Sequence, residues 1–342
     1  MEKTAFIERT GGPEVIQWRD AELPPPGAGE VRMRHHAVGL NYIDTYHRSG
    51  LYPIDLPGGL GSEAAGVVEA VGEGVTDFKV GDRVGVFGPA RGAYATARNV
   101  SADLLVPLPE EVDDRTAAAI LLKGTTTAFL IEDCAKVQPG WTVLVHAAAG
   151  GVGHLAVGWL KAIGATVIGT VGSEAKAERA RAAGADHVIL NRSEDVAARV
   201  RDITGGTGVP VVLDGVGKAT WEASLNSAAR RGLVVSFGNA SGPVDGVNLG
   251  ILAAKGSLFV TRPTLFDYAL TAADKRRLAE RVFAMLAKGA IIPEIGQEFP
   301  LTDAAEAHRA IEAGAAPRRD STEPRPRGCS VPGEPPQGLP SF

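Results

Sequence analysis

The hydrophobic pattern between residues 142 and 261 alternates between two periods. Short apolar runs rich in Val, Ile and Leu occupy residues 142–148, 166–171, 187–190, 210–216, 233–238 and 257–261. Helical patterns fill the intervals, from the glycines after residue 148 to residue 162, then at 174–183, 194–203 and 219–229. Near-continuous apolar strands joined by amphipathic helices are typical of a parallel sheet covered on both faces. The pattern therefore predicts a doubly wound, dinucleotide-binding α/β fold.

The segments on either side have different patterns. Up to about residue 125, short strands such as 31–38, 66–71 and 83–87 alternate with turns rich in glycine and proline, which indicates an all-β module. A helical pattern over residues 114–136 is interrupted at Gly124. Past residue 262, an amphipathic helix at 273–289 has Met285 on its core face, residues 291–301 resemble a strand, and residues 303–314 form a helix that ends at a glycine. This last portion is expected to pack against the first module.

The final residues, 315–342, follow neither period. They are rich in proline, poor in apolar side chains and without alternation. Such a composition buries too little apolar surface to offset the entropy of ordering the chain. This segment is predicted to be disordered.

Composition and charge limit the classes of function. A net charge of −5 and the lack of a basic stripe argue against nucleic-acid binding, which needs positive charge to neutralise phosphates. The chain has no run of about 18 apolar residues and no apolar signal core at its N-terminus. Cys134 and Cys329 are too few for a disulfide framework or a four-cysteine zinc site. These features predict a cytoplasmic protein.

The sequence TVLVHAAAGGVG at residues 142–153 has the pattern of a strand, a tight turn and the start of a helix. Gly150 and Gly151 are expected to let the backbone turn sharply and approach a ligand, and Gly153 to let the helix pack close to the strand. Amides at the start of the helix would then face a pyrophosphate. Glycines also end strands for structural reasons, so this motif alone is weak evidence for a nucleotide.

The end of the second strand of this fold indicates which nucleotide is bound. Enzymes that prefer NAD place an Asp or Glu about 20 residues beyond the glycine turn, on the ribose hydroxyls. Here the strand ends at Gly172 and Ser173, and Lys176 follows. A hydroxyl and a lysine accept a 2′-phosphate that an acid would repel, so the sequence predicts NADPH. The alternative is that Ser173 caps the next helix and Lys176 is a solvated charge; for Ser173 both roles are compatible.

Six stretches together resemble one family. They read GLNYIDTYHRSGLYP (39–53), GSEAAGVVEAVGEGV (61–75), LLKGTTTAF (121–129), HAAAGGVG (146–153), RRGLVVSFGNASG (230–242) and NLGILAAKGSLFVTRP (248–263). Over residues 1–314 the chain resembles the zinc-independent NADPH:quinone oxidoreductases of the zeta-crystallin type, in the medium-chain dehydrogenase/reductase superfamily.

The resemblance implies an α/β protein with a GroES-like, β-rich catalytic domain and a Rossmann domain with a doubly wound parallel sheet. It implies the first part of the catalytic domain at residues 1–125, the NADPH-binding domain at 126–262, a return to the catalytic domain at 263–314 and an atypical tail at 315–342. It also implies an active site between the two domains and a homodimer built by edge strands of the nucleotide domains. The partners expected are a quinone or related electron acceptor, with neither nucleic acid nor membrane insertion.

The resemblance also assigns site residues. The residues implied on the substrate side are Asn41, Asp44, Tyr46, Tyr52 and Thr126, of which Thr126 lies near the nicotinamide. The cofactor-binding residues, including those already named from the sequence, are Ala148, Gly150, Gly151, Val152, Gly153, Gly172, Ser173, Lys176, Asn191, Phe237, Gly238 and Asn239. Asn41 and the tyrosine hydroxyls can donate to a carbonyl oxygen that becomes negative. Simple packing is an equal alternative for either tyrosine.

No metal is expected. Where zinc-dependent members of the superfamily have a cysteine and a His-Glu pair, this chain has Asn41 and Gly61-Ser62-Glu63, which make no adequate ligand set. His35 and His36 are adjacent in a strand, so their side chains point to opposite faces.

Two features depart from the family. Asn191 stands where related reductases have a tyrosine that stacks near the adenine end of the cofactor, so weaker NADPH binding is expected, partly compensated by Arg192. Residues 315–342 stand where family members have a short strand that closes the catalytic domain. A frame shift in the coding sequence or a lineage-specific tail would produce this difference.

Two rival functions share the fold: an NADPH-dependent alkenal or enone reductase, and an NADPH-binding crystallin-like protein with little turnover.

Overall fold

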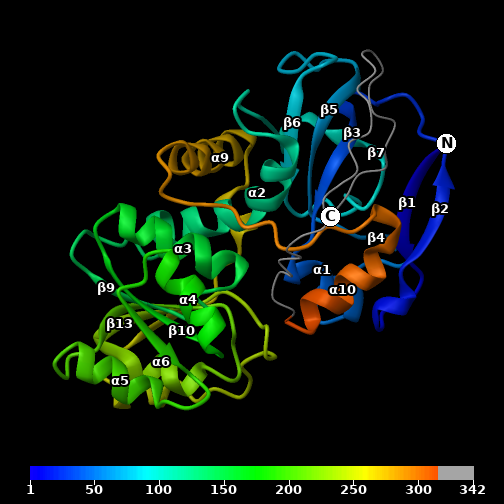
Figure 1. The fold of residues 1–342 in the computed structure, drawn as a ribbon. Helices are drawn as coiled ribbons and strands as arrows, with labels where there is room; N and C mark the ends of the chain where they lie inside the picture. The colour runs from blue at the N-terminus through cyan, green and yellow to red at the C-terminus, as the bar shows by residue number, and fades with distance from the viewer. Residues whose placement is uncertain (315–342) are drawn as a thin grey trace, which may run out of the picture. The chain divides into compact units, whose positions relative to one another are not determined.

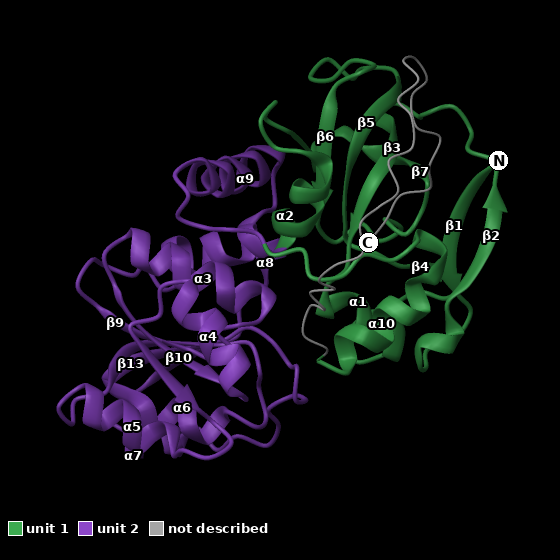
Figure 2. Ribbon diagram, in the orientation of Figure 1, with its two compact units in different colours: residues 1–122, 294–342 green, residues 123–293 purple. Residues whose placement is uncertain are grey.

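A computed structural model describes residues 1–314, and the expected disorder of the tail lies outside the described residues. The chain divides into two compact units (Figures 1 and 2). Unit 1 contains residues 1–122 and the described residues from Glu294 onward, and unit 2 contains Lys123–Pro293. The return to unit 1 therefore begins at Glu294 rather than at residue 263, because the helix at 272–287 packs within unit 2.

Unit 1 is built on two sheets and a few helices (Figure 1). The larger sheet has the order β7 (Ala97–Ser101), β3 (Glu30–Gly39), β5 (Glu63–Val71), β6 (Arg83–Phe87) and β8 (Leu105–Pro107), all antiparallel. The smaller sheet has the order β2 (Gln17–Ala21), β1 (Glu2–Ile7) and β4 (Gly58–Gly59). Met33, Val68, Val86 and Leu301 are among the buried side chains of its core. The β-rich domain expected for this part of the chain is thus confirmed.

Unit 1 is not all-β, which corrects the expectation from the turn-rich pattern. Helix α1 (Tyr42–Ser49) follows β3, and α10 (Ala304–Glu312) comes from the returning segment. Single helical turns lie at η1 (Pro13–Val15), η2 (Ala102–Leu104) and η4 (Leu301–Asp303). No strand forms at residues 291–301, where only Pro300 makes an isolated bridge and Pro293 removes a backbone donor that a ladder needs.

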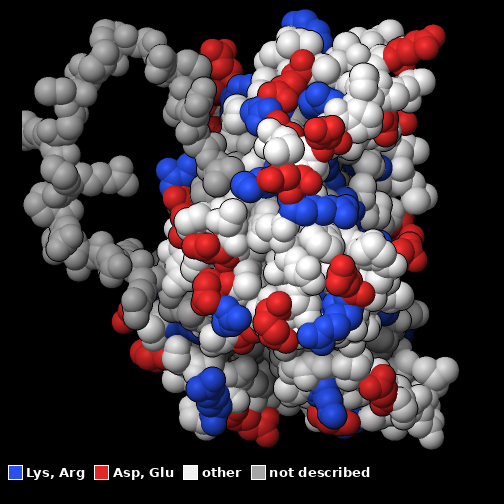
Figure 3. Space-filling view, turned by 90° about the vertical axis from the view of Figure 1, so that its right-hand side faces the viewer, with Lys and Arg blue, Asp and Glu red and all other residues white. Residues whose placement is uncertain are grey.

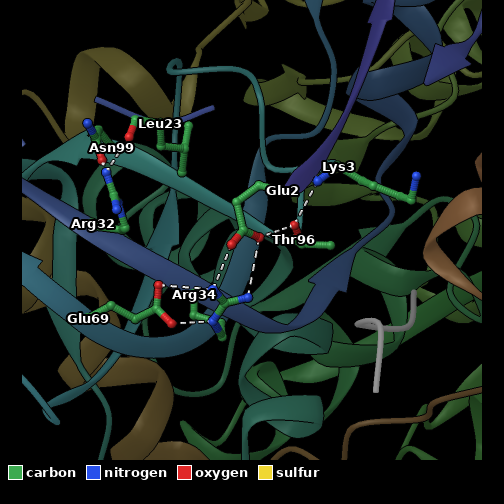
Figure 4. A network of polar contacts seen from close by, with 8 residues as sticks. All are labelled: Glu2, Lys3, Leu23, Arg32, Arg34, Glu69, Thr96 and Asn99. Atoms are coloured by element: carbon green, nitrogen blue, oxygen red, sulfur yellow. Dashed lines mark hydrogen bonds and ion pairs between the residues drawn. The ribbon is translucent and has the colours of Figure 1, made fainter. Parts of the chain in front are cut away.

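Arg34 joins the two sheets of unit 1 (Figure 4). From β3, its guanidinium donates to Glu2 of β1 at 2.8 Å and to Glu69 of β5 at 3.2 Å. Glu2 also accepts from the Thr96 hydroxyl. The Arg34 guanidinium lowers the pKa of Glu2. The cluster is partly exposed, so its contribution to stability is small.

Unit 2 has one six-stranded parallel sheet in the order β11 (His187–Leu190), β10 (Thr166–Val171), β9 (Thr142–Val145), β12 (Val209–Asp214), β13 (Ala228–Ser236) and β14 (Phe259–Thr261). Written in chain order this is 3-2-1-4-5-6, the order of a dinucleotide-binding fold. Leu144, Ile168 and Val212 are among the buried side chains on one face. The parallel sheet expected from the apolar strand pattern is confirmed.

The helices of unit 2 are α3 (Gly151–Ala162), α4 (Glu174–Ala182), α5 (Val196–Ile203), α6 (Trp221–Ser227), α7 (Gly250–Ala254), α8 (Leu265–Tyr268) and α9 (Ala272–Ala287). Helix α2 (Asp114–Ala128) spans the boundary at Leu122 and is followed by a π-helical turn, η3 (Phe129–Cys134). Gly124 does not interrupt α2. A Cβ there would lie 2.7 Å from Val282 of α9, so the glycine permits close helix packing. Met285 is buried, as expected.

Charges are mixed on the face drawn in Figure 3, where Lys and Arg lie among Asp and Glu without a basic patch. Among residues 1–314 no helix is both long and apolar enough to cross a membrane.

Candidate active site

The sharp bend in the turn after β9 does not lie at the glycines that the sequence indicates. The residue with left-handed backbone is Ala147, at φ +52°, and Gly150 is extended at φ −82°. Gly150 and Gly151 are exposed at the start of α3, while Gly153 is buried. A Cβ on Gly153 would overlap the Ala147 carbonyl oxygen and lie 3.0 Å from the Cα of Ala148. Gly153 thus permits close packing of α3, as expected, whereas Ala147 makes the sharp bend.

The residues that the sequence assigns to the adenine end of the cofactor lie at the carboxyl ends of β10 and β11. Gly172 and Ser173 follow β10, and Ser173 is the N-cap of α4 without a side-chain capping bond. Its exposed hydroxyl is therefore not committed to the helix cap. A Cβ on Gly172 would lie 3.3 Å from Arg192 Nε and 3.7 Å from Asn191 Oδ1. Lys176, one turn into α4, is half-buried. The structure thus places the Ser173 hydroxyl, the Asn191 amide and the Arg192 guanidinium at these two strand ends, with Lys176 in the first turn of α4.

The segment after β13 is held in place by close backbone packing and by hydrogen bonds from Arg262. A Cβ on Gly215, after β12, would lie 2.7 Å from the Phe237 ring, and a Cβ on Gly238 would overlap the Gly215 carbonyl oxygen. The Asn239 amide accepts from Arg262 Nη2 at 3.1 Å in the orientation that satisfies its neighbours. Arg262 also donates to the Ser236 carbonyl at 2.8 Å. Residues 237–239 thus lie at the carboxyl edge of the same sheet as the glycine turn.

In unit 1, Asn41 and Asp44 organise the start of α1. Asn41 is the N-cap, and its backbone N–H donates to Asp44 Oδ2 at 2.9 Å. The Asn41 side-chain Nδ2 donates to Glu63 Oε2 at 2.7 Å. Glu63 Oε1 accepts from the Leu122 amide at 2.7 Å. Asn41 therefore uses one of its two Nδ2 protons within the fold, and its side chain is buried.

Tyr46 of α1 and Tyr52, just beyond the end of this helix, lie together. Their ring centroids are 5.2 Å apart with planes at 62°, an edge-to-face pair. Both are half-buried, and the Tyr52 amide donates to the Tyr46 carbonyl at 3.1 Å. Thr126, on the part of α2 within unit 2, is also half-buried. Each tyrosine can pack against the other and also contact a substrate.

Asp44 is completely buried, and its surroundings change the ionisation of its carboxyl group. Burial raises the pKa of Asp44 to about 7, and nearby Glu63 adds to the rise, while bonds from the Asn41 amide, Ser62 and Tyr94 oppose it. The Ser62 hydroxyl donates to Asp44 Oδ1 at 2.8 Å, and the Tyr94 hydroxyl lies 3.2 Å from Oδ2. A carboxyl that titrates near neutral pH is typical of functional sites.

Sequence reasoning missed Tyr94, which bonds to Asp44, and the two residues that follow it in a series of polar contacts, His308 and Arg48. Tyr94, His308 and Arg48 lie far apart in the sequence, and the fold brings them together. The available signals were a histidine on the apolar face of a helix pattern and an arginine at the end of α1. Neither indicates a partner without the tertiary structure.

The residues at the position of the superfamily's zinc do not form a metal site. Glu63 and Asn41 bond to each other, and among residues 1–314 no group of three His, Cys, Asp or Glu side chains is placed to hold a metal ion. His35 is buried against the Ala93 and Ala95 carbonyls, and His36 is exposed beside Asp114, so they do point to opposite faces.

Comparison with known proteins agrees with this architecture. Residues 27–110 match the family described as alcohol dehydrogenase GroES-like domain, and residues 151–292 match the family described as zinc-binding dehydrogenase. A quinone oxidoreductase of Pseudomonas aeruginosa is 53% identical over 314 residues, covering 92% of this chain and 97% of the relative. A 2-haloacrylate reductase of a Burkholderia species is 43% identical over 316 residues, covering 90% and 95%.

A solved structure shares the fold over nearly the whole described chain. The Escherichia coli quinone oxidoreductase complexed with NADPH superposes with a TM-score of 0.90 at 46% identity, covering 92% of this chain and 98% of that one. Together these similarities show that the chain belongs to the quinone oxidoreductase family of the medium-chain dehydrogenase/reductase superfamily.

Proposed function

We propose that this chain is an NADPH-dependent reductase that delivers hydride equivalents to quinones without a metal ion. The observation that carries the proposal is the end of β10, where Arg192 lies beside Gly172 and Ser173 is the N-cap of α4, with Lys176 in its first turn. All three side chains can donate to a 2′-phosphate. Relatives named quinone oxidoreductase, and one of them complexed with NADPH, support the choice of cofactor and acceptor.

The two units supply different groups. In unit 2, the amides at the start of α3 bind pyrophosphate, and residues 237–239 hold the nicotinamide ribose. When bound, NADPH supplies the hydride, and the protein supplies orientation and electrostatics. In unit 1, the second Nδ2 proton of Asn41 and the hydroxyls of Tyr46 and Tyr52 are donors for the acceptor's carbonyl oxygen, which gains negative charge.

A test of this function is NADPH oxidation, compared with NADH, across ortho-quinones, para-quinones, alkenals and enones. We expect turnover with NADPH and at least one quinone class. The alternative favoured by the 2-haloacrylate reductase relative is reduction of an activated double bond, and it predicts turnover on alkenals or enones only. NADPH binding without oxidation in the presence of any acceptor would instead indicate a crystallin-like binding protein.

Replacing Lys176 with alanine should raise the KM for NADPH roughly 10- to 100-fold, because a charge-assisted bond to phosphate contributes about 1.5–3 kcal/mol. The KM for NADH should change less than about twofold, since NADH lacks the 2′-phosphate. Lys288→Ala, at an exposed position after α9, is the control for loss of one positive charge. Equal losses for both nucleotides would contradict a phosphate contact.

The proposal includes a homodimer and a cytoplasmic location. Strand β14 is an edge of the six-stranded sheet, and Phe259 on it is 62% exposed. A long apolar side chain on an open edge is a place where a second copy can pair. The two cysteines, too few for a disulfide framework, agree with a reducing compartment.

Phe259→Lys should therefore convert the dimer to a monomer, because it places a charge within the paired edge. Light scattering coupled to size-exclusion chromatography measures the change, and the far-ultraviolet spectrum should stay unaltered. Ile292→Lys, at another exposed apolar side chain of unit 2, serves as the control. A wild-type protein that is monomeric at micromolar concentration would refute this part of the proposal.

A further inference from the structure

A chain of polar contacts inside unit 1 connects α10 to the buried carboxyl of α1. Arg48 Nη1 lies 3.2 Å from His308 Nδ1, and His308 Nε2 lies 2.9 Å from the Tyr94 hydroxyl. That hydroxyl lies 3.2 Å from Asp44 Oδ2. At the outer end, Arg48 pairs with Glu312 of α10. His308, Tyr94, Arg48 and Asp44 are all buried.

The donor and the acceptor in each of these hydrogen bonds follow from Arg48, where the series of contacts begins. A guanidinium has no acceptor, so Arg48 must donate and His308 Nδ1 must accept. Burial and the charge of Arg48 lower the pKa of His308 to about 3, so the imidazole is neutral and carries its one proton on Nε2. That proton is donated to the Tyr94 oxygen, which leaves the single hydroxyl proton of Tyr94 to be donated to Asp44.

We infer that Arg48 and His308 are positioning residues that direct the Tyr94 hydroxyl proton onto Asp44, and thereby set the protonation equilibrium and orientation of the carboxyl that holds Asn41. Only the catalytic consequence of this inference rests on the proposed function. The Arg48 guanidinium offers donors only, so this series of contacts orients donors and does not conduct protons to the surface.

The groups that face Asp44 come from several elements. Glu63 of β5 disfavours the charged carboxylate, whereas the Asn41 amide, the Ser62 hydroxyl and Tyr94 favour it. Tyr94 stays protonated because burial and nearby Asp44 raise its pKa well above 10. His308 faces Arg48 and Tyr94. Removing Tyr94 as a donor therefore shifts Asp44 further toward its neutral form.

The first experiment determines the tautomer of His308 in the wild-type protein. Two-bond proton–nitrogen correlation spectra of the full chain report which imidazole nitrogen of His308 carries the proton, with His308→Gln used for assignment. We expect Nε2–H. A proton on Nδ1 would overturn the inference, because His308 would then compete with Asp44 for the Tyr94 proton.

The second experiment follows the ionisation of Asp44 by the carboxyl ¹³C resonance of aspartate-labelled protein, assigned with Asp44→Asn. Tyr94→Phe should raise the pKa of Asp44 by enough to change the ratio of its two forms roughly tenfold at a given pH. Arg48→Met should also raise it, because His308 can then take the other tautomer. Arg48→Lys keeps the donor, and Glu312→Gln breaks only the outer ion pair, so both should leave the pKa unchanged.

These outcomes separate positioning from a merely structural role. A loss of thermal stability in Tyr94→Phe or Arg48→Met with an unchanged Asp44 pKa would overturn the inference. If Arg48→Met does not fold, the tautomer of His308 and the Asp44 pKa in Tyr94→Phe still decide the matter. The measurement uses neither NADPH nor quinone, so absence of quinone turnover would refute the proposed function and leave this result intact. With turnover, the pH profile of kcat/KM should move with the measured pKa.

Discussion

Replacing Gly153 with alanine is expected to destabilise unit 2 by about 3 kcal/mol or more and to weaken NADPH binding at least roughly tenfold. The new methyl group would overlap the Ala147 carbonyl oxygen and lie 2.9 Å from the Ala147 carbonyl carbon. Both are backbone atoms of the turn after β9, so α3 must move away from the strand. The amides at the start of α3 would then lose their alignment on the pyrophosphate.

Gly151→Ala is the matched control, since it adds the same methyl group two residues earlier. There the Cβ would meet only the Lys123 side chain, at 2.9 Å from Cδ, and a flexible side chain can shift. Alanine is also favoured over glycine in a helix. Thermal unfolding without cofactor should show a fall of roughly 6–12 °C for Gly153→Ala and little change for Gly151→Ala. Equal stabilities would contradict the close packing of α3 on the turn.

The parallel sheet could be predicted from the sequence because each of its central strands is buried on both faces. Strands such as β9 and β10 read as short apolar runs, and the helices between them have a different period, so the order of elements is visible in one dimension. Unit 1 gives a weaker signal. Helix α1 has only eight residues, and its capping pair of Asn41 and Asp44 resembles turn chemistry.

The candidate cofactor residues of unit 2 could be predicted from the sequence because they follow directly after strands. Gly172 and Asn191 end neighbouring parallel strands, so adjacency in space follows from the topology. The contacts that connect Asp44 to Tyr94 and His308 could not be predicted in this way. Tyr94 and His308 are separated by 214 residues, and their bond depends on how α10 docks within unit 1. Neither hydrophobic period nor residue spacing determines that docking.

The role of Ala147 shows a second limit of sequence reasoning. Its φ of +52° is imposed by the surrounding turn, although alanine does not favour the left-handed region. The sequence predicts the bend at Gly150 and Gly151 because glycine adopts positive φ most easily. Here the glycine at position 153 is required for space, and the bend lies at a residue that propensity would not select.

Asp44 should make the folded protein less stable as the pH rises from about 4 to about 7. Its pKa is raised by burial from an ordinary value of 3.8 to about 7 in the folded state. Between these values the folded protein retains a proton that the unfolded chain has released, so the unfolded state becomes progressively favoured. The full effect, reached above about pH 7, is on the order of 4 kcal/mol.

The difference in unfolding free energy between wild type and Asp44→Asn isolates this contribution. His35, His47 and His308 have pKa values lowered to about 3, 4 and 3 by burial, and they stabilise the folded state as the pH rises toward about 6.5. Their effect is common to both proteins and cancels in the difference. Urea unfolding from pH 4 to 8 should therefore show wild type losing stability relative to Asp44→Asn up to about pH 7, and a constant difference above it. A difference that stays flat, or that grows with pH in favour of wild type, would mean that Asp44 is ionised inside the fold at neutral pH.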